Sequence, residues 1–574
     1  MELYGKAVSR GIVTGSVLRY VANLPQDEAG EPMFDNAEAA IAAYHHARDA
    51  AYQELEALKG RLVDHHPDEA AILSAHQEIL MDFALDDEIC AMLQSGQEGP
   101  CAAAECCYEQ FADLLSQSPS ALMQERVSDL RDVKQRLLRV LLGQKTQDLG
   151  NLPQPVIVVA DDLYPSDTVS LDRDKVLGII TQVGGNTSHT AIIARSYGIP
   201  AVLGVPNAMA LLRDGETVVL DAVAGKILTE PTPDVLQSYA KLARDEAERA
   251  AKTGAFLASV PVTLDGTRIT VNLNIATVEV EELAGARYAD GCGLFRTEFL
   301  YMQGTALPTE EEQFLSYQKI LSAFEQKSVT LRTMDISGDK QVPLLDLPKE
   351  ENPFLGVRGL RLSLARPALF RQQLRAALRA SIHGTLKIMF PMVGSLDDLR
   401  AARNVVSEVA DELDASGIAH AQDVQIGIMV EVPSIALIAD LVAKEVDFIS
   451  IGTNDLTQYL CAADRMNPEL RAYYQEYHPA LVRTLKHLAD TFNAAGKGIS
   501  VCGELAGDPL AVPLLIGLGI HSLSVGFASL AGTKQIVRHL TTEAARQLAE
   551  EVLALSTAED IRRTLLAFSK QLEV

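Results

Sequence analysis

The stretch VQIGIMVEVPSIALIADLVAKEVDFISIGTND (424–455) decides the fold of the larger part of the chain. It contains a short apolar run that ends at Glu431, a helix-length segment, and a second apolar run that ends in Asn454 and Asp455. Apolar runs of this length bounded by polar residues are typical of buried strands. The stretch therefore predicts one strand–helix–strand unit, the repeating element of parallel α/β folds.

The same unit recurs on both sides of this stretch, from Arg268 onward. The strand-like runs are ITVNLNIA (269–276), GCGLFRTE (291–298), SVTLRTMDI (328–336), LKIMFPM (386–392), VQIGIMVE (424–431), DFISIGTND (447–455), GISVCGE (498–504) and HSLSVGF (521–527). Helix-length segments separate most of them. Eight units in about 300 residues predict a (β/α)8 TIM barrel. A doubly wound open sheet is the competing interpretation.

Polar side chains stand where these predicted strands end. They are Arg296, Arg332, Glu431, Asn454, Asp455 and Cys502. Because the carboxyl ends of barrel strands form one mouth, we expect these side chains to converge there. Solvated loop residues are the alternative for any single one of them, but not for the set.

The residue types at the predicted mouth suit a small anionic substrate. Arginine binds phosphate or carboxylate through two parallel hydrogen bonds, so Arg296, Arg332 and Arg465 are candidates for an anion cradle. Glu431 and Asp455 offer hard oxygens for a cation, and Mg²⁺ commonly takes one or two protein carboxylates. A calcium site, or salt bridges to the arginines, is the alternative. A phosphorylated compound held by arginines and Mg²⁺ fits the collection best.

The residue pattern of the N-terminal part of the chain changes twice. Residues 1–21 and 146–230 carry short β-branched runs such as PVIVVA (155–160), whereas 22–145 show apolar residues at helical spacing and few glycines. We therefore predict an α/β domain interrupted by an inserted all-helical subdomain. A polar, Ala-rich helix within 231–260 is predicted to link it to a barrel domain over 261–574.

One segment of the α/β domain stands out, GGNTSHTAIIARSYGIPAV (184–202). Thr187 or Ser188 can cap a helix that begins near His189. An imidazole in the first helical turn lies beside free N–H groups that favour anions, so His189 could carry a phosphoryl group. A lone histidine is more often an ordinary exposed or capping residue, and spacing alone does not overcome that alternative.

The net charge, the apolar runs and the cysteines of the chain limit the partners and the cellular location that can be expected. The net charge of −27 argues against duplex nucleic acid and anionic membranes, which both require a basic face. Neither a signal peptide nor an apolar run long enough to span a membrane is visible. Seven cysteines without a CxxC pair suit a reducing compartment, so we expect a cytoplasmic protein.

Eight strings in this order resemble Enzyme I of the phosphoenolpyruvate:sugar phosphotransferase system. They are GGNTSHTAIIARS, GLFRTEFL, LRTMDISGDK, KEENPFLGVRGLR, IMFPMV, VEVPSIA, SIGTNDLTQY and VCGELAGD, spread over residues 184–507. The resemblance implies a swivelling phosphohistidine domain followed by a barrel that binds phosphoenolpyruvate and forms a homodimer. The family transfers the phosphoryl group to its own histidine and then to a phosphocarrier protein, HPr or a relative, and releases pyruvate.

The resemblance also implies roles for individual residues. His189 would be the phosphorylated intermediate and Cys502 the proton donor. The substrate would be bound by Arg296, Arg332, Asn454, Asp455 and Arg465, and Mg²⁺ by Glu431 and Asp455. The helical subdomain would dock the phosphocarrier, and segment 64–86 with Asp68, Glu69 and His76 is a candidate for part of that surface. An ordinary solvated helix face is the alternative for this segment.

Two rival functions and several departures from the family pattern bear on this assignment. Pyruvate phosphate dikinase and phosphoenolpyruvate synthase share such domains but need an ATP-binding domain, and no Gly-rich nucleotide loop precedes His189. A regulatory protein without turnover would be expected to lack a catalytic group, and none is missing. The sequence departs from the family pattern at four positions, Arg10, Asn186, Ser337 and Met466. These departures leave open which phosphocarrier the chain serves and in which branch of the system it acts.

Overall fold

The computed structural model describes residues 1–20, 34, 36–62, 67–96, 99–116, 121–143, 149–150, 152–164, 167, 171–184, 189–302, 306–336, 345, 347, 350–470 and 472–572. The proposed capping residues Thr187 and Ser188 lie outside this range, as do Asn186 and Ser337. The chain divides into two compact units, Met1–Ala250 and Ala251–Val574.

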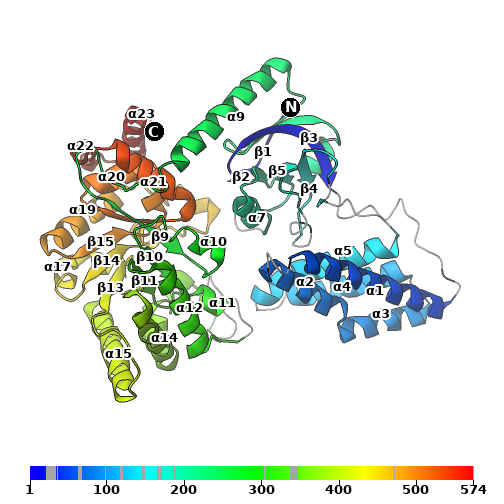
Figure 1. The fold of residues 1–574 in the computed structure, drawn as a ribbon, viewed down its shortest axis with the longest axis horizontal. Helices are drawn as coiled ribbons and strands as arrows, with labels where there is room; N and C mark the ends of the chain where they lie inside the picture. The colour runs from blue at the N-terminus through cyan, green and yellow to red at the C-terminus, as the bar shows by residue number, and fades with distance from the viewer. Residues whose placement is uncertain are drawn as a thin grey trace. The chain divides into compact units, whose positions relative to one another are not determined.

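The first unit contains an eight-stranded sheet, ordered β1-β8-β7-β3-β4-β5-β6-β2. Figure 1 labels its strands β1 to β5. The strands are β1 (Glu2–Tyr4), β2 (Lys6–Ser9), β3 (Ile12–Tyr20), β4 (Val156–Ala160), β5 (Val176–Thr181), β6 (Ala201–Leu203), β7 (Thr217–Asp221) and β8 (Lys226–Thr229). Strands β3, β4, β5 and β6 run parallel, and the other pairs are antiparallel. Helices α7 (His189–Tyr197) and α8 (Ala208–Leu211) accompany the sheet, and apolar clusters fill both its faces.

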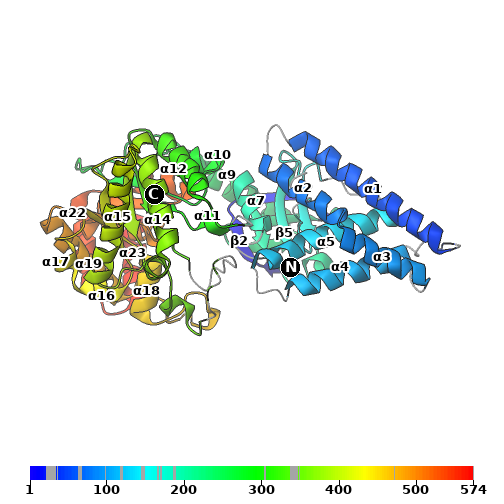
Figure 2. The ribbon, with the colours of Figure 1, turned by 90° about the horizontal axis from the view of Figure 1, so that it is seen from below.

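A block of five helices lies in the chain between β3 and β4. They are α1 (Ala37–Leu62), α2 (Pro67–Leu80), α3 (Phe83–Ser95), α4 (Pro100–Ser116) and α5 (Ala121–Leu141), and they lie side by side in both ribbon views (Figures 1 and 2). The helical spacing of apolar residues predicted for 22–145 is confirmed in α1, where Tyr44, Ala51 and Leu55 are buried in the core of the block. This helical insertion into an α/β sheet confirms the predicted fold of the N-terminal part.

The placement of His76 corrects one expectation. The ring of His76 is 0% exposed and lies between Asp129 and Asp132 of α5, with Nε2 3.5 Å and Nδ1 3.8 Å from their carboxylates. A side chain enclosed in this way offers no surface for docking, so His76 is not part of a partner-binding face. The side chains of Asp68 and Glu69 lie outside the described residues.

The second unit is a closed parallel barrel, as predicted, ordered β10-β11-β12-β13-β14-β15-β16-β9. Its strands are β9 (Thr270–Ile275), β10 (Cys292–Arg296), β11 (Ser328–Arg332), β12 (Thr385–Phe390), β13 (Gln425–Val430), β14 (Phe448–Ile451), β15 (Gly498–Val501) and β16 (Ser522–Val525). The strands close into a barrel, so the competing interpretation of a doubly wound open sheet is wrong. One continuous apolar core joins the strands to the helices.

Helices follow the barrel strands and cover the barrel (Figures 1 and 2). They are α10 (Val280–Leu283), α11 (Phe299–Met302), α12 (Glu310–Phe324), α13 (Leu360–Ala365), α14 (Pro367–Ala380), α15 (Leu396–Ala415), α16 (Pro433–Leu437), α17 (Ala439–Val442), α18 (Thr453–Cys461), α19 (Pro479–Ala494), α20 (Ala511–Gly517), α21 (Phe527–His539), α22 (Thr542–Leu553) and α23 (Ala558–Gln571). Among the described residues, none of the helices in the chain combines the length and apolar character needed to cross a membrane.

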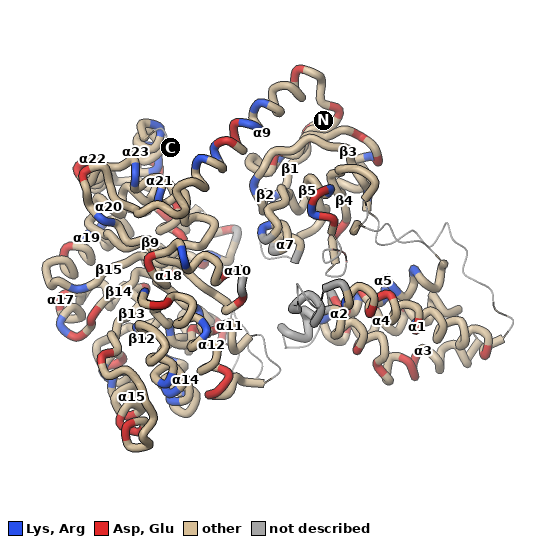
Figure 3. Tube along the Cα trace, viewed as in Figure 1, with Lys and Arg blue, Asp and Glu red and all other residues tan. Residues whose placement is uncertain are grey.

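Helix α9 (Pro233–Gly254) runs across the boundary between the two units. Acidic and basic residues are interspersed along it (Figure 3), and most of its residues are exposed. Its last turn is tied to the barrel unit, because Thr253 Oγ1 donates a hydrogen bond of 2.8 Å to Gln535 Oε1. A helix predicted over this region is therefore present, and it is long, polar and thinly packed.

Candidate active site

Two adjoining cavities open at the carboxyl end of the barrel, with volumes of about 460 and 520 Å³. The smaller cavity is lined by all seven barrel residues that the sequence singled out: Arg296, Arg332, Glu431, Asn454, Asp455, Arg465 and Cys502. Arg296, Asn454 and Cys502 also line the larger one. The predicted convergence of these side chains at one mouth is thus present in the structure.

Arg296 ends β10 and is half-buried at the rim of both cavities. Among the described residues it forms no ion pair within 4.0 Å, in contrast with the other arginines of the mouth. A guanidinium that faces a cavity without a carboxylate partner is available to an anionic ligand.

Arg332 ends β11 and is held by two buried carboxylates. Its Nη2 lies 2.5 Å from Glu298 Oε1, and its Nη1 lies 3.0 Å from Asp335 Oδ2. Burial by itself would lower the pKa of Arg332, but the charges of Glu298 and Asp335 outweigh it and raise the pKa. The guanidinium therefore stays charged and fixed in one orientation.

Arg358, which the sequence argument left without a role, lines the same cavity. It is 3% exposed, and its guanidinium bridges Asp335 at 3.3 Å and Asp455 at 3.2 Å. Gly359, which follows it, has a φ of +54°, a conformation that favours glycine and turns the chain into α13. Arg358 follows no barrel strand, so a search restricted to strand ends could not find it, although KEENPFLGVRGLR contains it.

Glu431 follows β13 and is completely buried. Its Oε1 accepts a hydrogen bond of 2.6 Å from the Met392 backbone N–H, whereas its buried Oε2 has no hydrogen-bond partner among the described residues. Burial first, and then the charge of Asp455, raise the pKa of Glu431 to about 8. A buried carboxylate with an unsatisfied oxygen is costly unless a cation offsets it.

Asp455 lies in the first turn of α18, just past the end of β14. Its Oδ1 meets Arg358, and its Oδ2 lies 3.6 Å from Arg465 Nη1. Together with Glu431 it supplies hard carboxylate oxygens in a cavity that is otherwise open to water and substrate. These donors fit Mg²⁺, which binds few protein carboxylates and keeps the rest of its octahedron for water and ligand.

Asn454 is fixed on the other side of the mouth. Its Oδ1 accepts a hydrogen bond of 3.0 Å from the Glu504 backbone N–H, and its carbonyl accepts one of 3.2 Å from the Tyr474 hydroxyl. The amide Nδ2 of Asn454 is thereby held as a donor at a cavity wall.

Cys502 follows β15 and is 2% exposed. Its Sγ lies 3.7 Å from the Ile451 carbonyl oxygen, and burial raises the pKa of the thiol to about 11. The thiol is therefore protonated at neutral pH. A thiol in that state, beside a charged arginine and two cavities, can donate a proton.

His189 is the first residue of α7, as predicted, but its side chain lies outside what the structure describes. The first turn of α7 is fixed by the buried Thr190, whose hydroxyl lies 3.2 Å from Asp162 Oδ1 and 3.3 Å from the Leu163 carbonyl. Of the other departures, Arg10 is exposed and pairs with Glu246, and Met466 is exposed at the cavity rim.

A parallel barrel that carries arginines, carboxylates and a protonated thiol at its carboxyl end is typical of enzymes that act on small anionic substrates. Comparison with known proteins makes the class specific. Residues 250–542 match the PEP-binding domain of PEP-utilising enzymes, residues 152–225 the mobile domain, and residues 4–126 the N-terminal domain.

Relatives match over nearly the whole chain. The phosphoenolpyruvate-protein phosphotransferase of Bacillus sp. (strain S) is 41% identical over 561 residues, which are 97% of this chain and 96% of the relative. The enzymes of the same name from Haemophilus influenzae and Bacillus subtilis are 39% and 38% identical, over 93% and 99% of both chains. The chain belongs to the phosphoenolpyruvate-protein phosphotransferases, within the PEP-utilising enzyme family.

Proposed function

We propose that this chain takes the phosphoryl group of phosphoenolpyruvate onto His189 and passes it to the histidine of an HPr-like phosphocarrier, as the first step of the phosphotransferase system. The observation that carries the proposal is the convergence of Arg296, Arg332 and Arg358 with the Glu431–Asp455 carboxylates and Cys502 in one barrel mouth. Full-length relatives named for this reaction support it.

The arginines of the mouth divide into two kinds with different tasks. Arg332 and Arg358 are buried and already paired with carboxylates, so they form a rigid wall in which Glu298, Asp335 and Asp455 offset the charge of the two guanidinium groups. Arg296 has its guanidinium available, and together with Arg465 and Asn454 it would bind the phosphate and carboxylate of the substrate. Phosphoryl transfer depends mostly on positioning and on spreading charge, which preorganised guanidinium groups supply.

Glu431 and Asp455 would hold Mg²⁺. When bound, the ion supplies charge neutralisation for the phosphate and carboxylate oxygens of the substrate. The unsatisfied Oε2 of Glu431 supports this assignment, because a carboxylate kept for a structural role would be hydrogen-bonded at both oxygens.

The proton balance assigns a task to Cys502. Transfer breaks the bond between phosphorus and the enol oxygen and forms a bond between phosphorus and a nitrogen of His189, which leaves the enolate of pyruvate. The enolate takes a proton at carbon from the Cys502 thiol, and the thiolate regains its proton from water. The raised pKa of Cys502 keeps the donor loaded at neutral pH.

The helical block, which interrupts the α/β sheet, is proposed to dock the phosphocarrier, and the barrel to form the homodimer. Both assignments rest on the family resemblance, as does the swivelling of the His189 domain, whereas the proposed cytoplasmic location rests on the cysteine pattern of the sequence. Which phosphocarrier is served can be tested by offering the phosphorylated chain a panel of HPr-like proteins and measuring transfer of label to each.

Labelling by phosphoenolpyruvate tests the proposal as a whole. The chain incubated with ³²P-phosphoenolpyruvate and Mg²⁺ should acquire acid-labile, base-stable label, the behaviour of a phosphohistidine. His189→Ala should abolish the label while the protein stays folded, and His539→Ala, which replaces an exposed histidine of the barrel unit, should keep it. Labelling of His189→Ala at the rate of the parent chain would contradict the proposal.

A further inference from the structure

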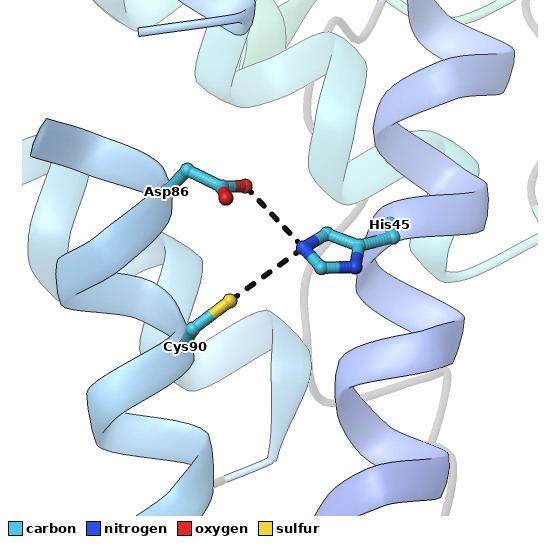
Figure 4. A group of neighbouring side chains, drawn as sticks. All are labelled: His45, Asp86 and Cys90. Carbon is cyan, nitrogen blue, oxygen red and sulfur yellow. Dashed lines mark hydrogen bonds and ion pairs between the residues drawn. The ribbon is translucent and has the colours of Figure 1, made fainter. Parts of the chain in front are cut away.

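Three side chains of the metal-ligating kind meet in the helical block, where the proposed phosphotransfer uses none of them. His45 comes from α1, and Asp86 and Cys90 come from α3, with one ligand atom of each within 4.8 Å of the other two. Asp86 and Cys90 are four residues apart and therefore share a helix face. Figure 4 shows both side chains directed at the same nitrogen of the His45 ring.

The backbone that carries these groups is firmly anchored. Asp82 caps α3 by accepting hydrogen bonds of 2.9 and 3.1 Å from two backbone N–H groups of its first turn. Leu85 and Ile89 are buried in the block, and so is Tyr44, which precedes His45 in α1. The three ligand side chains lie at the edge of this packed interface and are half-buried, so an ion can reach them.

The separations between the ligand atoms suit a metal better than a hydrogen-bonded group. His45 Nε2 lies 3.5 Å from Asp86 Oδ1 and 3.6 Å from Cys90 Sγ. A single ring nitrogen cannot direct one proton at both partners, and 3.5 Å is long for a nitrogen–oxygen hydrogen bond. A tetrahedral zinc ion, with its usual bond lengths, would require separations of about 3.6 Å between S and N and about 3.3 Å between N and O.

The charges also balance. A thiolate and a carboxylate together neutralise a divalent ion. Arg48 Nη1 lies 2.7 Å from Asp86 Oδ1 and would serve as the outer hydrogen-bond partner that ligating carboxylates usually have, while its own charge is also offset by Asp49 at 3.0 Å.

We propose that His45, Asp86 and Cys90 form a site for a zinc-class divalent cation that links α1 to α3. The ligands are the His45 ring nitrogen, an Asp86 carboxylate oxygen and the Cys90 sulfur, and water completes the tetrahedron. Thiolate and imidazole select zinc over magnesium, so the site is chemically distinct from the carboxylate pair of the barrel. Binding replaces the thiol proton, which passes to solvent.

Cobalt(II) as a spectroscopic substitute for zinc tests the proposal on the full chain stripped of metal. Titration should produce the intense visible bands of tetrahedral cobalt together with a sulfur-to-cobalt charge-transfer band, and zinc should remove both. Cys90→Ser should abolish the charge-transfer band. His45→Gln should weaken zinc binding by at least about 100-fold, the upper end of what loss of an outer partner costs.

Matched variants separate this site from other thiols and imidazoles. His46→Gln changes the neighbouring exposed histidine and Cys106→Ser a half-buried cysteine of α4, and both should bind cobalt as the parent chain does. Far-ultraviolet circular dichroism checks that every variant is helical. If Cys90→Ser does not fold, the loss of zinc affinity in His45→Gln decides the matter, because His45 is 39% exposed and can be replaced without opening the core.

Three results would overturn the proposal. One is the absence of tetrahedral cobalt bands from the parent chain, which would mean a hydrogen-bonded cluster only, because octahedral cobalt alone would be explained by the carboxylate pair of the barrel. The others are a charge-transfer band that survives Cys90→Ser and an equal loss of zinc affinity in His45→Gln and His46→Gln.

Discussion

The Cys502 thiol is almost completely buried, yet its proposed role requires a proton that it can donate and regain. Replacing it with alanine should leave phosphoenolpyruvate and Mg²⁺ binding intact, because no arginine or carboxylate of the mouth is changed. Pyruvate formation should fall by about 10²- to 10⁴-fold, the usual contribution of a positioned acid. Calorimetry measures the binding and steady-state kinetics the rate of pyruvate formation, with Cys461→Ala as the control. An unaltered rate of pyruvate formation would return Cys502 to a packing role.

The raised pKa of Cys502 predicts a particular dependence on pH. The proton-donating form is present below the folded pKa of about 11 and is lost as the pH rises through it. An ordinary thiol with a pKa of about 8.5 would already lose most of its protons by pH 9. Thiolate absorbance of the parent chain, minus that of Cys502→Ala, should therefore stay near zero from about pH 7 to 9. A difference signal that rises near pH 8.5 would contradict the assigned environment.

Arg358 bridges the buried carboxylates of Asp335 and Asp455, so its loss should affect both. Arg358→Met removes the cation that Asp335 and Asp455 share, and breaking a buried pair typically costs about 3–5 kcal/mol. Arg332 and Arg465 remain beside these two carboxylates, so we expect a loss at the low end of this range, about 3 kcal/mol. We expect a lower melting temperature and weaker binding of phosphoenolpyruvate and Mg²⁺, because Arg358 holds Asp455 in place at the cavity wall. Arg361→Met, at an exposed arginine three residues on, is the control. Equal behaviour of the two variants would remove Arg358 from the site.

Sequence reasoning reached those residues whose position follows from the barrel itself. Arg296, Arg332 and Glu431 end or directly follow strands, and the carboxyl ends of parallel strands must meet. Arg358 reaches the mouth through a loop, and its partner Asp455 lies 97 residues away in the sequence. No local periodicity encodes such a contact. Glu298 and Asp335 were within reach, because they stand two and three residues after the arginines that end β10 and β11.

Among the elements, α12 shows how a barrel helix is fixed at one end. Thr309 accepts from the Glu312 backbone N–H at 3.3 Å, and the Glu312 carboxylate accepts from the Thr309 N–H at 2.7 Å, a reciprocal capping box. Thr309→Ala should lower the free energy of unfolding of the barrel unit by about 1 kcal/mol, whereas Thr309→Ser should keep it. Denaturant titration measures the change. Equal stability of the two variants would show that the cap contributes nothing.

The elements themselves followed from alternation and spacing, but their exact ends did not. The run DFISIGTND was interpreted as a strand through Asp455, whereas β14 ends at Ile451 and α18 begins at Thr453. The switch comes at Gly452, because the chain must leave the barrel wall and place Asp455 in a helical turn over the mouth. The start of α7 at His189 could be anticipated from the candidate capping residues that the sequence places before it, but the direction of the imidazole could not.

For the whole molecule, the division of labour between the two units leads to a prediction. His189 belongs to the first unit, and the proposed substrate ligands all belong to the second. A fragment ending at Leu257 keeps the sheet, the helical block and α9. It should fold and exchange phosphate with a phosphorylated phosphocarrier, but it should take no label from phosphoenolpyruvate and Mg²⁺. Labelling of this fragment by phosphoenolpyruvate without the barrel would contradict the proposal that His189 is phosphorylated at the barrel mouth and then passes the group to the phosphocarrier.

The pairing of β3 with β4 has a consequence for how such a chain can be rebuilt. Ser16 lies opposite Val156 and Tyr20 opposite Ala160, so the two strands are immediate parallel neighbours although the helical block lies between them in the chain. Parallel neighbours need only a crossover of a dozen or so residues, and longer loops add little further entropic cost. We therefore expect that the block can be exchanged as a unit. If the block docks the phosphocarrier as proposed, replacing it with the equivalent segment of a paralogue should change which protein receives the phosphate and leave the residues of the barrel mouth unchanged.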